Sequence, residues 1–185
     1  MAVRRDVTEA EERLLGTEYL HRGNPRQQQA AAVLETLEIE ELPGLSQWAL
    51  AGTIPLEVDL PESDLDVLVD TQDVTGARDA LTARFREHPH FAAWAHSAEE
   101  EAWCVTFESG GFLIEFFLQN RPLAKQRAFR HLVAEYALLQ RHGEDFRREI
   151  HRLKESGLKT EPAFARALNL DGDPYLALLE PTLLD

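Results

Sequence analysis

Two aspartates separated by a single residue are the strongest candidates for chemistry in this chain of 185 residues. Asp64 and Asp66 begin the run DLDVLVD, whose β-branched and apolar residues predict a strand over 64–70. Residues two apart on a strand project from the same face, with Cα atoms about 6.6 Å apart. Carboxylates at this spacing can bind one divalent cation or two neighbouring ones.

A third carboxylate on a neighbouring strand would complete an acidic cluster. The segment EAWCVTFESGGFLIEFFLQ has two alternating runs around Gly110-Gly111, which predicts a β-hairpin. A two-residue loop sets the register: Phe107 opposite Ile114, Val105 opposite Phe116, Thr106 opposite Glu115, and Glu108 opposite Leu113. Glu115 is the preferred third acid, and Glu108, beside the turn, is the alternative.

Clustered carboxylates repel one another unless cations lie between them. Mg²⁺ binds oxygen ligands of this kind together with substrate phosphates. Two such ions about 3.5–4 Å apart would bind the attacking and leaving oxygens of a phosphoryl transfer. Gly52 and Thr53 end the preceding strand predicted over 46–52. Glycine allows the backbone to approach a phosphate, and Thr53 adds a hydroxyl and an N–H group.

The segment GTIPLEVDLPESDLDVLV resembles the signature of the nucleotidyltransferase superfamily, which has the polymerase-beta-like fold. That signature is a strand ending in Gly and then Ser, Gly or Thr, a loop, Asp-hydrophobic-Asp, and an acidic residue on a later strand. The segments QRAFRHLVAEYALL, LKTEPAFARAL and GDPYLALL extend the resemblance to the bacterial domain-of-unknown-function family 4269, over about residues 24–180.

This resemblance implies an α+β fold, with a nucleotidyltransferase-like mixed sheet flanked by helices and a C-terminal helical annex. It places Gly52 and Thr53 on the phosphate-binding turn, Asp64 and Asp66 at the metal-binding pair, and Glu115 at the third acidic position. The implied activity moves a nucleoside monophosphate from a nucleoside triphosphate to an acceptor hydroxyl. The implied cofactors are Mg²⁺ or Mn²⁺ ions, two with each nucleotide, and Glu115 would help to activate the hydroxyl.

The sequence departs from the family pattern after the phosphate turn. Ile54, Pro55 and Leu56 stand where small bacterial nucleotidyltransferases often have basic residues. Ser63 and two tail lysines, Lys125 and Lys159, complete our set of nucleotide-binding candidates. Other cations that could compensate lie in the helical tail: Arg121, Arg127, Arg130 and Lys154.

The sequence leaves three functions open. The first is nucleotidyl transfer to a small molecule or a protein hydroxyl. The second is a non-catalytic regulatory module that keeps the fold and binds a nucleotide or a partner, as the missing basic residues would favour. The third is modification of an RNA end, which a basic stripe at Lys125, Arg127 and Arg130 would serve.

Composition limits the partners and the compartment. The chain has 33 acidic and 19 basic residues and a net charge of −14, so we expect no binding to duplex nucleic acid, which requires clustered cations. It has no apolar run of the ~20 residues needed to span a membrane, and we expect neither a membrane association nor a signal peptide. The single cysteine, Cys104, fits a reducing, cytoplasmic location.

The elements that position these residues follow from the remaining patterns. We expect helices over about 8–20, from Asn24-Pro25 onward and over 73–87, and a strand over 91–96. From Pro122 the pattern is helical to the end, in four segments. We therefore predict a core over 1–120 and an annex over 121–185, packed together as one unit.

Overall fold

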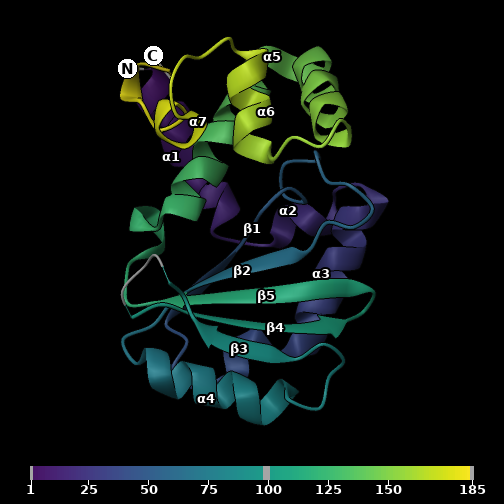
Figure 1. Ribbon diagram of the computed structural model, residues 1–185, viewed down its shortest axis with the longest axis vertical. Helices are drawn as coiled ribbons and strands as arrows, with labels where there is room; N and C mark the ends of the chain where they lie inside the picture. The colour runs from purple at the N-terminus through teal and green to yellow at the C-terminus, as the bar shows by residue number, and fades with distance from the viewer. Residues whose placement is uncertain (1, 98–100, 184–185) are drawn as a thin grey trace.

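The structure is a computed structural model that describes residues 2–97 and 101–183. Five strands form one mixed sheet with the order β1-β2-β5-β4-β3 (Figure 1). Their bounds are β1 Gln47–Ala51, β2 Leu65–Asp70, β3 Ala92–Ala95, β4 Trp103–Ser109 and β5 Phe112–Gln119. β2 and β5 pair in parallel, and the other neighbours are antiparallel. The predicted α+β class with a mixed sheet flanked by helices is confirmed.

Helices cover the sheet and form a separate layer beside it (Figure 1). Their bounds are α1 Ala2–Leu14, α2 Glu18–His21, α3 Pro25–Leu37, α4 Val74–Phe85, α5 Arg127–Glu155, α6 Thr160–Ala167 and α7 Pro174–Ala177. Short 3-10 turns lie at η1 Ile39–Glu41, η2 Leu123–Lys125 and η3 Pro181–Leu183. No helix among the described residues is long and apolar enough to cross a membrane.

The β4–β5 hairpin has the register predicted from its two glycines. Phe107 lies opposite Ile114, and Thr106 lies opposite Glu115. The apolar face of the sheet packs on α4, where the Phe85 and Phe107 rings stack with centroids 4.3 Å apart. Asp66 and Glu115 occupy the opposite face, because side chains alternate along each strand.

Sequence signals also set several helix boundaries correctly. Asn24 caps α3: its side chain accepts a hydrogen bond from the Gln27 N–H, and the Gln27 side chain accepts one from the Asn24 N–H. Asp73 caps α4 through the Gly76 N–H. Within α5, Gly143 has non-helical backbone angles, so two helical segments meet there as the pattern after Pro122 predicts.

The expected first helix was wrong in its bounds. Thr8 lies inside α1 rather than at its start, and the helix ends at Leu14, with α2 beginning only at Glu18. The residues before Thr8 include good helix formers, and their propensity outweighs a threonine cap. α1 packs against α5, so the first helix of the chain lies with the annex helices (Figure 1). The division at residue 120 stays a prediction.

Candidate functional site

The parallel pairing of β2 with β5 brings two of the predicted acids side by side. Asp66 and Glu115 are direct Cα partners, and Ala51, the residue before Gly52, is the partner of Asp66 on β1. Neighbouring strands lie about 4.8 Å apart. The sheet therefore places both carboxylates next to the turn that follows β1.

Asp64 lies one residue before β2, so it is not on the strand as the sequence suggested. Its charge nevertheless acts on both other acids. Burial raises the pKa of Asp66 to about 7, with further contributions from Asp64 and Glu115. Burial also raises the pKa of Glu115, and Asp64 adds to the increase while His96 opposes it. The three carboxylates therefore form one electrostatic group.

Gly52 makes a close approach to this group. It has a φ of +75°, and a Cβ added at this position would lie 2.2 Å from Oδ2 of Asp66. A side chain here would therefore displace the Asp66 carboxylate. This explains why glycine stands at the turn, both for its left-handed backbone and for its lack of a side chain.

The loop between β1 and β2 is held by hydrogen bonds. The Thr53 hydroxyl donates to the Ser63 hydroxyl oxygen over 3.2 Å, and the Leu60 N–H donates to the same oxygen over 2.9 Å. Ile54 and Leu56 are buried in the core, so the apolar residues after the turn support the loop from inside. Ser63 thus fixes the shape of the loop immediately before Asp64.

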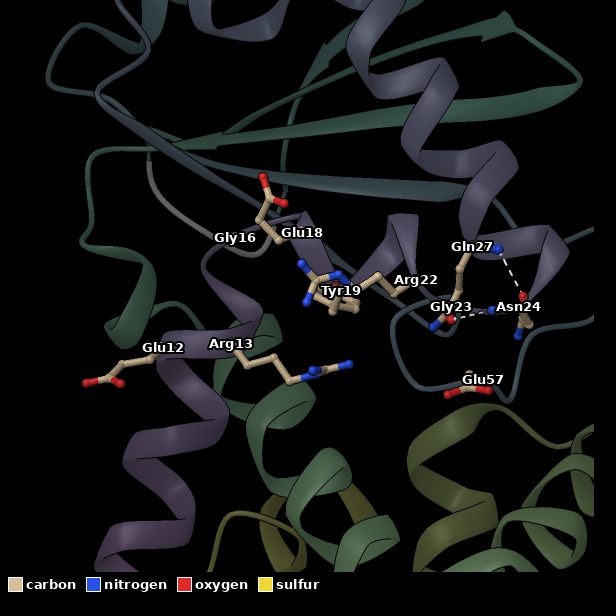
Figure 2. Close-up of a pocket in the computed structure, with 10 residues that line it drawn as sticks. All are labelled: Glu12, Arg13, Gly16, Glu18, Tyr19, Arg22, Gly23, Asn24, Gln27 and Glu57. Atoms are coloured by element: carbon tan, nitrogen blue, oxygen red, sulfur yellow. Dashed lines mark hydrogen bonds between the residues drawn. The ribbon is translucent and has the colours of Figure 1, made fainter.

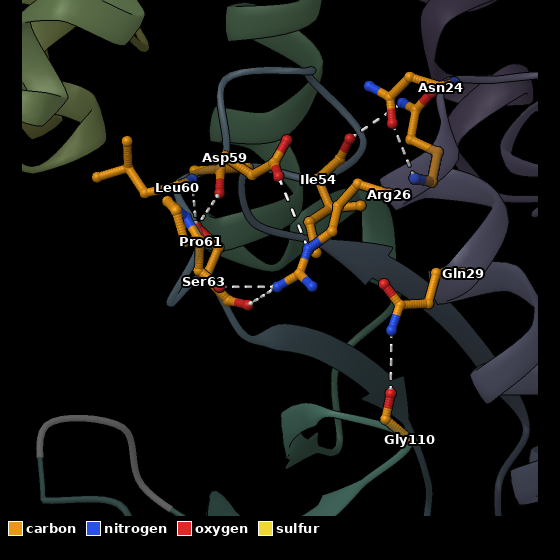
Figure 3. Close-up of polar contacts among 11 residues, drawn as sticks. Asn24, Arg26, Gln29, Ile54, Asp59, Leu60, Pro61, Ser63 and Gly110 are labelled. Atoms are coloured by element: carbon orange, nitrogen blue, oxygen red, sulfur yellow. Dashed lines mark hydrogen bonds and ion pairs between the residues drawn. The ribbon is translucent and has the colours of Figure 1, made fainter.

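Arg26 of α3 is a positioning residue that the sequence analysis missed (Figure 3). Its guanidinium donates to the carbonyl oxygens of Pro61, over 3.0 Å, and Ser63, over 3.4 Å. It also lies 3.9 Å from the Asp59 carboxylate and 4.0 Å from the centre of the Phe112 ring. No local sequence signal joins residue 26 to a loop more than 30 residues away.

The candidate cations of the tail differ in their placement. Lys125, in η2, and Lys159, before α6, are exposed. Lys154 is only 7% exposed and donates to the Thr160 hydroxyl over 3.4 Å. Burial lowers the pKa of Lys154, and the charges of Glu135, Asp59, Glu161 and Asp64 oppose that change. Lys154 is thus the buried tail cation that interacts with the acidic group.

The three core carboxylates fit divalent cations in charge and in chemistry. Burial and the neighbouring negative charges favour the protonated forms of Asp66 and Glu115, and Mg²⁺ or Mn²⁺ would reverse that preference. Their carboxylate oxygens do not all lie within 4.8 Å of one another, however. Among the described residues, one group has three potential ligand atoms within 4.8 Å of one another, and it is His131, Glu135 and Glu161 of the annex.

A pocket of about 550 Å³ lies elsewhere, between α1, α2 and the start of α3 (Figure 2). Arg13, Tyr19, Arg22 and Glu57 are among its lining residues. None of the residues that we predicted for the site lines it.

The fold is similar to solved nucleotidyltransferase structures. The Cid1 poly(U) polymerase with bound MgGTP has a TM-score of 0.54 and 12% identity, covering 75% of this chain and 46% of that one. Cid1 with the UTP analogue UMPNPP has a TM-score of 0.51 and 14% identity, with 75% and 44% covered. A cytoplasmic RNA terminal U-transferase has a TM-score of 0.52 and 13% identity, with 83% and 45% covered.

These similarities show a nucleotidyltransferase-like fold, and the chain spans less than half the length of those enzymes. Comparison with curated protein sequences gives no match. One family matches along residues 32–181, from within α3 to η3. The chain therefore belongs to the family described as Domain of unknown function (DUF4269), as its resemblance predicted.

Proposed function

We propose that this protein is a metal-dependent nucleotidyltransferase that moves a nucleoside monophosphate from a nucleoside triphosphate to an acceptor hydroxyl. The observation that carries the proposal is the close approach of Gly52 to Asp66, which itself lies beside Glu115. A phosphate turn against a pair of strand carboxylates is the arrangement that this chemistry requires. The nucleotidyltransferase-like fold supports the same reading.

Each residue has a distinct role in the proposed reaction. Asp64, Asp66 and Glu115 would hold two Mg²⁺ or Mn²⁺ ions, which when bound stabilise the attacking and leaving oxygens. Gly52 and Thr53 would contact the phosphates through the backbone and the Thr53 hydroxyl. Glu115 would accept the proton of the acceptor hydroxyl.

Cations must also balance the charge of the triphosphate. Lys154 joins Lys125 and Lys159 as a candidate, and it is the one whose charge acts on Asp64 and Asp66. Ser63 would act through the loop, because its hydroxyl oxygen already accepts two hydrogen bonds.

The test is thermal unfolding of the protein with each nucleoside triphosphate, with and without Mg²⁺. A ligand at 100 times its Kd stabilises the folded state by about 2.7 kcal/mol. We expect this stabilisation for wild type with Mg²⁺, and its loss in Asp64→Asn/Asp66→Asn and in Glu115→Gln. Glu108→Gln is the matched control, because Glu108 is an exposed glutamate on the same hairpin and should not affect binding.

The outcome also decides between the alternatives. No stabilisation of well-folded wild type by any nucleotide would contradict the proposal. Binding without transfer of an α-labelled nucleotide would favour the non-catalytic module, which the buried Ile54 and Leu56 after the turn also favour. The structural neighbours include an RNA terminal U-transferase, so RNA 3′ ends belong among the acceptors tested. The net charge of −14 favours a small acceptor over RNA.

A further inference from the structure

The annex contains a second cluster of potential metal ligands, separate from the carboxylates of the sheet. His131 and Glu135 lie one turn apart on α5, and Glu161 lies in the first turn of α6. One ligand atom from each of the three residues lies within 4.8 Å of the other two. His131 is buried, and the described residues provide no partner for either ring nitrogen.

Three polar atoms of this cluster are buried without hydrogen bonds to the described residues. Both ring nitrogens of His131 and Oε1 of Glu135 lack a partner among the described residues. His131 and Glu135 are each only 4% exposed. A buried polar group without a partner costs about 1–3 kcal/mol. A cation bound by these atoms would recover that cost, whereas an exposed cluster would gain nothing comparable.

The charges around the cluster leave room for a further cation. Lys154 acts on Glu135 and Glu161, but the same ammonium also acts on Asp59 and Asp64. Arg26 also pairs with Asp59, but one ammonium cannot neutralise the other three carboxylates. Accordingly the pKa of Glu135 is raised well above its ordinary value, because burial and the Glu161 charge outweigh Lys154. A divalent ion would supply the missing positive charge.

We propose that His131, Glu135 and Glu161 bind a divalent transition-metal ion, with Zn²⁺ as the best fit, and that this ion links α6 to α5. One imidazole nitrogen and two carboxylate oxygens are ligands that Zn²⁺ accepts at about 2.0–2.1 Å. Ligand atoms around a tetrahedral ion at that distance lie about 3.4 Å apart. Small side-chain rotations from the observed spacing would therefore complete the site and leave a fourth position for water or a ligand.

Metal binding is tested in the full chain carrying Asp64→Asn/Asp66→Asn, so that the core site does not contribute. Protein stripped with a chelator is titrated with Co²⁺, followed by visible absorbance, and then with Zn²⁺ to displace it. We expect one ion per chain. Glu161→Gln and His131→Gln should each weaken binding at least about tenfold. Glu161 is partly exposed, so its variant should fold even if the change at buried His131 is disruptive.

His151→Gln is the matched control. His151 and Glu155 have the same four-residue spacing on α5 and lie 3.5 Å apart, but their side chains are 40% and 59% exposed. This variant should bind Co²⁺ as tightly as its parent. Absence of stoichiometric binding in the Asp64→Asn/Asp66→Asn protein would overturn the proposal. Equal affinity in Glu161→Gln and His151→Gln would overturn it as well. Neither result depends on nucleotide binding or transfer.

Discussion

The two acidic clusters of this molecule are built in different ways. In the core, Asp66 and Glu115 are neighbours because β2 and β5 pair in parallel, so backbone hydrogen bonds set their separation. In the annex, Glu161 meets His131 and Glu135 only because α6 packs against α5. A site on paired strands is thus determined by register, whereas a site between helices depends on how the chain folds back on itself.

Lys154 connects the two clusters electrostatically. Its charge acts on Glu135 and Glu161 in the annex and on Asp64 and Asp66 in the core. Glu161 also acts directly on Asp66. The two clusters are therefore coupled in charge, and the coupling can be tested from either side.

The largest expected effect is the pH dependence of Asp66 in protein stripped of metal. A carboxyl group whose pKa is about 7 when folded and 3.8 when unfolded keeps its proton in the folded state between these values. The unfolded state then binds fewer protons, so the free energy of unfolding falls as pH rises from about 4 to 7. At about 1.4 kcal/mol per pKa unit the total is about 4 kcal/mol. Asp66→Asn should remove this fall.

The measurement is denaturant unfolding of wild type and Asp66→Asn across pH 3–8. The quantity compared is the difference between their free energies of unfolding at each pH. The difference is needed because His131 has the opposite effect. Burial, with the charges of Arg127 and Arg130, lowers the pKa of His131 to about 4. The unfolded state therefore binds a proton at this histidine more readily than the folded state does, and the free energy of unfolding falls as pH decreases from about 6.5 to 4. That contribution is common to both proteins and cancels. A difference that stays flat between pH 4 and 7 would show that Asp66 is not protonated in the folded state.

The second prediction concerns the coupling itself. Lys154→Met removes the buried cation whose charge acts on both clusters. It should lower the free energy of unfolding by about 1–3 kcal/mol, because the carboxylates lose the attraction of that charge and the Thr160 hydroxyl loses its hydrogen-bond donor. Arg152→Met, two residues away, changes an exposed pair with Glu149 and should have little effect. Denaturant unfolding at pH 7 compares the two variants. Equal stability in both would mean that Lys154 does not stabilise the carboxylates.

Much of the core could be predicted from sequence because its signals are local. Alternation around Gly110-Gly111 set the hairpin register, and this register placed Glu115 at its position on the sheet. Cap residues such as Asn24 and Asp73 marked where helices begin. The position of Asp64, one residue outside β2, was missed because strand ends are weakly encoded in a run of alternating residues.

The annex cluster and the role of Arg26 could not be predicted in the same way. His131 and Glu135 show only the spacing of one helical turn, which exposed pairs such as His151 and Glu155 share. Their burial results from tertiary packing, in which α6 lies against α5 and Tyr175 of α7 lies against the His131 ring. The contacts of Arg26 with the loop at Pro61 and Ser63 likewise join distant segments. Periodicity carries no information on which helix covers which residue.

The smallest effects on stability are expected at two glycines, and only one of the two should also affect nucleotide binding. Gly52 in the core and Gly172 in the annex both have positive φ, +75° and +88°. An alanine should therefore cost about 1 kcal/mol in backbone strain at either position. At Gly172 no described heavy atom lies within 4 Å of the added Cβ, whereas at Gly52 the Asp66 carboxylate lies 2.2 Å away.

Because the crowded atom at Gly52 is the end of a side chain, the carboxylate of Asp66 can rotate away. Gly52→Ala should then cost only about 1 kcal/mol more than Gly172→Ala in denaturant unfolding. Rotation would, however, move a proposed metal ligand, so Gly52→Ala should lose the stabilisation by nucleotide and Mg²⁺ that Gly172→Ala retains. If both variants kept that stabilisation, the orientation of Asp66 against the turn would have no part in nucleotide binding, and the functional reading of the core site would fail at its central contact.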